Sequence, residues 1–283
     1  MKLKMKLMAA AVALAASAGA NAAMDTMLSG NSSLAFIALD STGSPISMVM
    51  DLGINLTDFL PTAVASNAGY NAVWNFNTNT RTVNGVAQAG DYAWSNALST
   101  FYGTGQNAET KWGVIAGDSL SDNVNGDQRF MTTTNTALAT IQQQSKANLS
   151  GFSTSDSVFT QNNLLPSHTT NAEGGSTATS GTAYVGQSFG TAGKWANKAT
   201  FVALAAEGVA QNFYMLDTND GIASNKALVT QFANSQNAAT FSYANGILTY
   251  SVAAVPEPSE YALMLAGLGM IGFMARRRIN NRA

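Results

Sequence analysis

The sequence contains no cysteine and only one histidine, His168. Disulfide bonds are therefore excluded, and we expect no zinc site, because such sites take several cysteine or histidine ligands. Only 11% of the residues are charged, and the basic residues of the central region are scattered singly. Nucleic acid binding needs clustered lysine and arginine, so we expect no nucleic acid partner. Without disulfides, the fold must rely on its own hydrophobic core.

The first residues of the chain form a segment of their own. Three lysines precede an apolar stretch over residues 7–18, and small residues follow. This order is typical of a secretory signal peptide, and the apolar stretch is too short to span a membrane comfortably. An A-x-A pattern ends at Ala22, so we predict cleavage between Ala22 and Ala23, with the bond after Ala20 as the alternative. Residues 1–22 are thus predicted to be removed on export.

The central region, residues 23–254, is predicted to be one exported, mainly β domain. The strongest local signal lies in residues 239–252, where two alternating runs flank Asn245-Gly246. This dipeptide tolerates the positive φ angles of a type I′ hairpin. Alternating or continuous apolar patterns predict further strands over 33–40, 45–54, 71–78, 111–117, 200–208 and 211–217. We predict a jelly-roll-like β-sandwich with helical insertions.

The helix signals in this region are weaker than the strand signals. Residues 91–103 and residues 135–151 are predicted to form helices, the second because it is rich in Ala, Leu and Gln and ends near a glycine. Residues 153–183 consist mostly of Ser, Thr, Asn and Gly. We interpret that stretch as a long surface loop or a poorly ordered insertion.

One motif in the body suggests catalysis. Residues 117–123, GDSLSDN, resemble the first block of GDSL esterases and lipases, in which a strand delivers a nucleophilic serine, here Ser119. Such a serine needs a base, and the base needs an orienting acid. The late Asp-x-x-His block of that family is not matched, because Leu165 stands where the aspartate would precede His168. We therefore predict no catalytic residue and no enzyme, interpret His168 as a solvated loop residue, and keep an esterase at Ser119 as the least favoured alternative.

Carboxylates are the remaining source of ligand chemistry. Asp118, Asp122 and Asp127 form one group and Asp217 and Asp220 another, but neither has the D-x-[DN]-x-[DN]-G spacing of a calcium loop. We predict no metal site and no cofactor. Calcium stays an open alternative, because exported domains meet millimolar calcium, where weak oxygen sites suffice.

The tryptophans raise a second alternative for the body. A glycan-binding β-sandwich, assisted by calcium or not, would stack sugars on exposed aromatic rings. The four tryptophans are Trp74, Trp94, Trp112 and Trp195. Most large aromatic side chains simply belong to the core, which is the competing interpretation.

The C-terminal residues have three parts in a fixed order. They are the triplet Pro256, Glu257 and Pro258, an apolar run over 261–275, and a basic end over 276–282 that opens with Arg276, Arg277 and Arg278. The prolines cannot join a helix or a central strand. The apolar run would form a membrane-spanning helix of roughly 22 Å, short of the roughly 30 Å hydrocarbon core. Because basic clusters stay on the cytoplasmic side, the body is expected outside.

This tail, residues 255–283, resembles the PEP-CTERM sorting signal of exported proteins in Gram-negative bacteria. The resemblance implies a precursor held transiently in the inner membrane, processing near the triplet by an exosortase after passage through the export machinery, and then release or surface attachment. Proteins with this signal typically occur alongside exopolysaccharide and biofilm genes. The resemblance therefore implies a biofilm setting, with exopolysaccharide as an expected partner. We therefore expect a structural or adhesive protein of the cell surface or extracellular matrix, with a plain membrane anchor as the alternative interpretation of the tail.

Overall fold

A computed structural model describes most of the chain. It covers residues 23–65, 69–104, 109–119, 128–149, 156–168, 173–195, 199–218, 226–234, 236–253, 264–268 and 270–271. The chain divides into two compact units, Met1–Ala253 and Ala254–Ala283. We call the first unit the body and the second the tail.

The described part of the body consists of many short strands with a few short helices. The strands are β1 (Ser33–Asp40), β2 (Ile46–Asn55), β3 (Asn71–Asn75), β4 (Thr80–Val83), β5 (Val86–Ala87), β6 (Tyr92–Ala93), β7 (Lys111–Asp118), β8 (Arg129–Thr134), β9 (Glu173–Ala178), β10 (Ala205–Ala206), β11 (Gln211–Asp217), β12 (Leu228–Gln231), β13 (Ala239–Ala244) and β14 (Ile247–Val252). The helical segments are η1 (Met27–Ser29), η2 (Leu56–Phe59), η3 (Pro61–Ala65), α2 (Ser95–Thr104), α3 (Leu138–Ile141), α4 (Lys146–Leu149), α5 (Asp156–Asn163) and α6 (Val185–Phe189).

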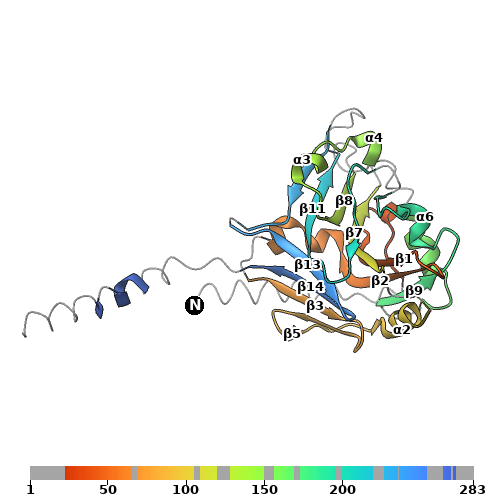
Figure 1. Cartoon of the computed structure of the whole chain (residues 1–283), viewed down its shortest axis with the longest axis horizontal. Helices are drawn as coiled ribbons and strands as arrows, with labels where there is room; N and C mark the ends of the chain where they lie inside the picture. Colours follow the sequence, from red (N-terminus) through yellow and green to blue (C-terminus); the bar gives the residue numbers. More distant parts are fainter. Residues whose placement is uncertain are drawn as a thin grey trace, which may run out of the picture. The chain divides into compact units, whose positions relative to one another are not determined.

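The strands form one curled sheet. Its order is β5-β4-β3-β14-β13-β11-β8-β7-β1-β2-β9-β6, with β10 paired to β7 and β12 paired to β11. Neighbouring strands are antiparallel except for the short β6–β9 pair. The prediction of a mainly β domain is confirmed. A jelly-roll-like sandwich, however, needs two separately bonded sheets, whereas the described strands form a single half-barrel (Figure 1).

The inner face of the curl holds the larger core cluster. Along β1, Leu34, Phe36 and Ala38 point to this side, as the two-residue period of a strand requires. The Phe36 ring lies 4.6 Å from Tyr243 on β13 and 5.0 Å from Phe76, measured between ring centroids. These contacts join strands from opposite halves of the sheet. Burial of each such aromatic side chain contributes about 1.5–3 kcal/mol to folding.

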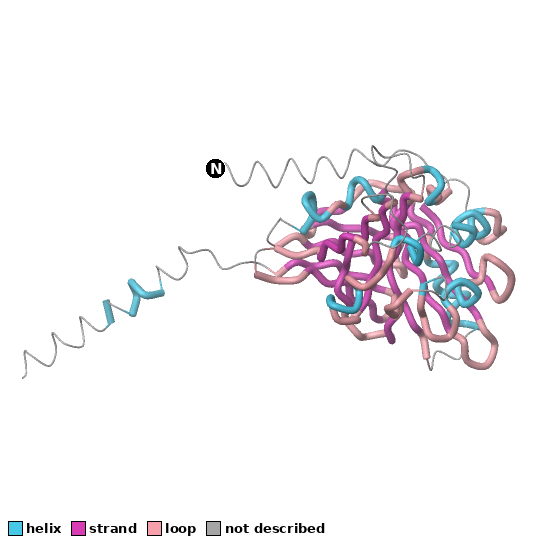
Figure 2. The backbone as a smooth tube through the Cα atoms, turned by 90° about the horizontal axis from the view of Figure 1, so that it is seen from above, coloured by secondary structure: helices cyan, strands magenta, loops and turns pink. Residues whose placement is uncertain are grey.

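The outer face of the same strands is also covered. Ala35, Ile37 and Leu39 of β1 belong to a second cluster, which includes Phe159 of α5 and Phe189 of α6. Figure 2 shows the strands at the centre of the body with the short helices toward its periphery. β1 is therefore buried along its whole length, which accounts for its nearly continuous apolar sequence.

Side chains connect β2 with elements that are not its neighbours in the sheet, and we call this line of contacts the seam. Trp94 Nε1 donates to the carbonyl of Asp51 (2.7 Å), Trp74 Nε1 to that of Leu52 (2.9 Å), and Arg81 Nη1 to that of Gly53 (2.7 Å). Three consecutive carbonyls of β2 thus bind residues from the region of β3, β4 and α2. Buried carbonyls left without such partners would destabilise the fold.

The local sequence predictions are confirmed where the pattern was strong. β1 and β11 have the predicted bounds, and β13 and β14 form the predicted hairpin. Asn245 and Gly246 have φ angles of 53° and 74° in its turn. The helix predicted over 91–103 corresponds to α2. Of the helix predicted over 135–151, the described residues 135–149 form the short helices α3 and α4 in place of one continuous helix. The strand predicted over 200–208 was mostly wrong, because only Ala205–Ala206 pairs with β7.

The prediction of a loop over 153–183 was wrong. This stretch contains α5 and β9, and β9 pairs with β2. The sequence of β9, EGGSTA, carries no strand signal, since glycine is depleted in strands. Packing explains it: a Cβ atom on Gly175 would lie 3.0 Å from Ala97 Cβ and 3.0 Å from Met50 Cγ. A larger residue would require Ala97 or Met50 to shift, so the close packing beneath α2 favours a glycine there.

Candidate functional site

Ser119, the proposed nucleophile, directly follows β7 and is itself buried. Its backbone N–H donates to the carbonyl of Met27 (2.9 Å), and its own carbonyl accepts from Gln128 Nε2 (2.9 Å). The residue is 7% exposed. Within the described residues its Oγ has no hydrogen-bond partner. A serine nucleophile needs a base at that atom, and the described part of the chain supplies none.

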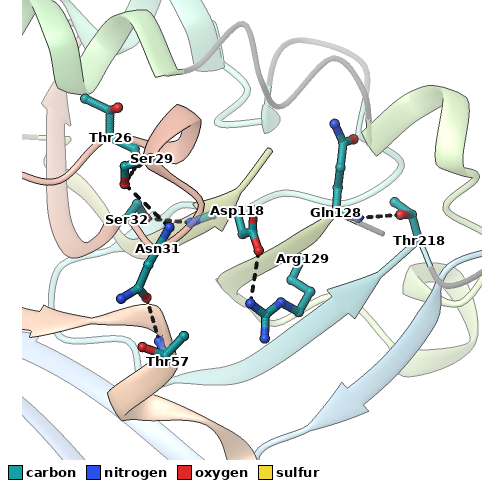
Figure 3. Close-up of polar contacts among 10 residues, drawn as sticks. Thr26, Ser29, Asn31, Ser32, Thr57, Asp118, Gln128, Arg129 and Thr218 are labelled. Carbon is teal, nitrogen blue, oxygen red and sulfur yellow. Dashed lines mark hydrogen bonds and ion pairs between the residues drawn. The ribbon is translucent and has the colours of Figure 1, made fainter. Parts of the chain in front are cut away.

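Asp118 and Asp217, one from each proposed carboxylate group, are the last residues of β7 and β11. Both strands end on the same side of the sheet, which we call this edge. Arg129 stands between them, because it faces Asp118 across β7–β8 and Asp217 across β8–β11. Arg129 Nη2 lies 3.0 Å from Asp118 Oδ2 (Figure 3). A guanidinium at this place repels a cation. The described residues hold no group of three or more potential metal ligands. Asp122, Asp127 and Asp220 lie outside the described residues.

Hydrogen bonds tie together the chain segments at this edge (Figure 3). Gln128 N–H donates to Thr218 Oγ1 (2.7 Å), and Thr218 N–H donates back to the Gln128 carbonyl (3.0 Å). Ser32 Oγ accepts from the N–H of Gly117 (2.7 Å), and Asn31 Oδ1 from that of Thr57 (2.9 Å). These hydrogen bonds hold the backbone segments at the ends of the strands in place, and their role is structural.

His168 is buried, which corrects its interpretation as a solvated loop residue. It is 4% exposed, and its backbone N–H donates to the carbonyl of Leu165 (2.9 Å) in the turn after α5. That turn carries the side chain into the protein interior. Burial of a lone histidine is a common structural feature and identifies no catalytic role.

All four tryptophans are fully buried. This confirms the interpretation that they belong to the core. Trp74 and Trp94 bind the seam carbonyls, and Trp112 Nε1 donates to the carbonyl of Ala206 (3.0 Å). Trp195 stacks on Phe189 at 5.7 Å. A sugar-stacking face of exposed tryptophans is therefore wrong for this chain.

Sequence reasoning missed Asp51, a carboxylate buried beside the seam. Its Oδ2 accepts from Ser33 Oγ (2.9 Å) and its Oδ1 from the N–H of Gly53 (2.7 Å). Desolvation raises the pKa of Asp51 to about 7, the two hydrogen bonds oppose this rise, and repulsion from Glu173 and Asp25 adds to it. The alternation of β2 predicts a solvent-facing residue at this position, and nothing in the sequence indicates that the outer face is covered as well.

The body ends just after β14, and the tail begins at residue 254. In the tail, residues 264–268 and 270–271 are helical, and their large apolar side chains Met264, Leu265, Leu268, Met270 and Ile271 are exposed. Within the described residues, no helix is both long and apolar enough to cross a membrane. The triplet, the three arginines and Ala22 lie outside the described residues, whereas Ala23 is described and exposed. The predicted spanning helix over 261–275 and the cleavage bond stay predictions.

Comparison with protein families matches the tail. The model of the PEP-CTERM protein-sorting motif covers residues 254–278, a range that includes the triplet, the apolar run and the arginines. No curated protein and no solved structure matches the chain. These comparisons therefore assign no activity to the body. The chain thus carries a PEP-CTERM protein-sorting motif in its tail, and this motif implies an exported protein that an exosortase sorts.

Proposed function

We propose that this protein is a structural or adhesive component of the cell surface or extracellular matrix, and that the body works without catalysis. The observation that carries the proposal is the position of the sorting motif. It begins at residue 254, directly after the last strand of a folded body that ends at Ala253. A compact folded unit is thus followed directly in sequence by a signal for export and surface delivery.

Removal of residues 1–22 would leave the described start of the body intact. Met24 is 2% exposed, and its main chain is bound on both sides by the Asn163 amide. Met24 N–H donates to Asn163 Oδ1 (3.0 Å), and Asn163 Nδ2 donates to the Met24 carbonyl (2.9 Å). Cleavage between Ala22 and Ala23 leaves this anchored methionine as the second residue of the mature chain.

Two observations favour a non-catalytic body. Ser119 is buried and held by hydrogen bonds of its main chain to Met27 and Gln128, as a structural residue would be. Asp118, the nearest carboxylate in sequence, is paired with Arg129. Adhesion to exopolysaccharide would then rely on polar surface groups, since the tryptophans are in the core. Residues 23–253 carry fourteen acidic and seven basic residues, and this net negative charge favours solubility after release.

Substitution in the triplet tests the sorting part of the proposal. Glu257→Ala should block processing, so the precursor accumulates in the membrane fraction of the native host and the surface and medium lose the protein. Glu260→Ala is the matched control, because it removes the same charge three positions further along the tail. Equal processing of the two variants would contradict recognition of the triplet.

A further inference from the structure

The tail is joined to a central strand of the sheet. β14 pairs with β13 over six residue pairs, from Ala244↔Ile247 to Ala239↔Val252. On its other edge it pairs with β3 over five, from Ile247↔Asn75 to Ser251↔Asn71. By contrast, β5 at the end of the sheet pairs only with β4, over two residue pairs. β14 therefore has a hydrogen-bonded ladder along each of its edges.

Further hydrogen bonds fasten the last residues of β14. Val252 N–H donates to the Tyr70 carbonyl (2.9 Å), and the N–H of Gly69 donates to the Val252 carbonyl (3.2 Å). The carbonyl of Ala253 accepts from Asn234 Nδ2 (2.8 Å) and from Asn237 Nδ2 (3.4 Å). We call these two asparagines the amide clamp. The clamp binds the last residue before the tail.

The inner face of β14 is packed into the core. Leu248, Tyr250 and Val252 belong to the inner cluster. The Tyr250 ring lies 4.9 Å from Phe59 and 4.9 Å from Phe241, measured between ring centroids. Moving β14 along its own axis would therefore disrupt aromatic packing as well as both ladders.

We propose that β14 is the load-bearing strand of the body, through which tension from the surface attachment enters the fold. The inference rests on the proposed function in its cell-surface form, and it takes the processed C-terminal end as the point of attachment. Antiparallel hydrogen bonds lie perpendicular to the strand. Tension along β14 therefore acts on the hydrogen bonds to β13 and β3 and on the amide clamp at the same time. Tension on β5 acts on only two residue pairs with β4, which can break one after the other.

Force spectroscopy on the full-length chain tests the proposal, and the lack of native cysteine allows two engineered handles. Ser180→Cys, in the exposed turn after β9, serves as the fixed handle. Figure 1 draws β9 on the side of the body away from the end of β14. The second handle is Ala283→Cys for pulling through the tail, or Val86→Cys, 60% exposed on β5, for pulling through the edge. Both double variants keep β14 and the clamp unchanged.

The expected result is a rupture force at least about twofold higher through the tail than through β5 at the same pulling rate, because forced unfolding follows the barrier that the load must cross. Equal or lower force through the tail would overturn the proposal. Asn234→Ala with Asn237→Ala should lower the force through the tail and leave the force through β5 unchanged. An equal reduction in both geometries would contradict a load-bearing clamp. The measurement uses purified chain, so a failure of sorting appears only in the host experiment.

Discussion

Trp74 on β3 donates its indole N–H to the carbonyl oxygen of Leu52 on β2, 2.9 Å away. The two strands lie far apart in the sheet order, and this bond joins them across the seam. Both residues are fully buried. A side chain thus connects β3 and β2, which pair with other strands in the described sheet and not with each other.

Trp74→Phe should loosen the seam. The substitution keeps an aromatic ring but leaves the Leu52 carbonyl without its donor, at a cost of about 1–3 kcal/mol in the free energy of unfolding. Urea denaturation gives that free energy, and hydrogen exchange at residues 51–55 should rise. Phe76→Leu, a buried substitution that removes no seam donor, should lower stability without this local increase in exchange. Unchanged exchange in Trp74→Phe would contradict the role of the indole.

Asp51 should make the body less stable as pH rises. Its pKa is raised from 3.8 to about 7 in the folded body. Between these values the folded state binds more protons than the unfolded state, so the free energy of unfolding falls by up to about 1.4 kcal/mol per pH unit. Urea denaturation at pH 5 and pH 8 measures the difference. Asp51→Asn should reduce this slope, whereas Asp91→Asn, at an exposed carboxylate, should retain it. A wild-type body equally stable at both pH values would refute the assignment.

Gly175→Ala should destabilise the contact between β9 and α2. The new methyl group would lie 3.0 Å from Ala97 Cβ, and overpacking of this kind costs about 1–3 kcal/mol. Gly103→Ala, in α2 with no atom within 4 Å of the new Cβ, should instead raise the unfolding free energy by about 0.5–1 kcal/mol. Thermal denaturation of both variants would test the pair, and a neutral Gly175→Ala would show that the interface has room.

Ser119→Ala should leave stability unchanged or increase it, because the buried Oγ has no partner among the described residues and its removal relieves a desolvation cost. Ser33→Ala is the matched control, since Ser33 Oγ donates to Asp51 and accepts from the Asp25 N–H. That variant should lose about 1–3 kcal/mol. Hydrolysis of short-chain esters should be the same for wild type and Ser119→Ala. Ester hydrolysis that disappears with Ser119→Ala would restore the esterase alternative.

Strong local signals in the sequence were enough for part of the fold. The alternation around Asn245-Gly246 predicts the last hairpin, and the buried run of β1 and the pattern of β11 give their bounds. These segments owe their form to neighbouring residues and to turn chemistry. The order of the C-terminal tail was recognisable for a similar reason, because its triplet, apolar run and arginines are continuous in sequence.

Long-range packing decided the rest. β9 has a glycine-rich sequence and becomes a strand because β2 pairs with it and α2 covers Gly175. The single curled sheet depends on pairings such as β3 with β14, whose residues are far apart in the chain. Asp51 was missed because period-two alternation shows which residues share a face and not whether that face is buried.

The most direct test of the account is the intact mass of the protein recovered from cells and from medium of its native host. We expect a mature chain that begins at Ala23 and ends near Pro256–Pro258, with any added mass identifying a group attached at the processed end. A cell-bound form that still carries Arg276–Arg278 and the final residues would contradict exosortase sorting and would make the tail a permanent anchor.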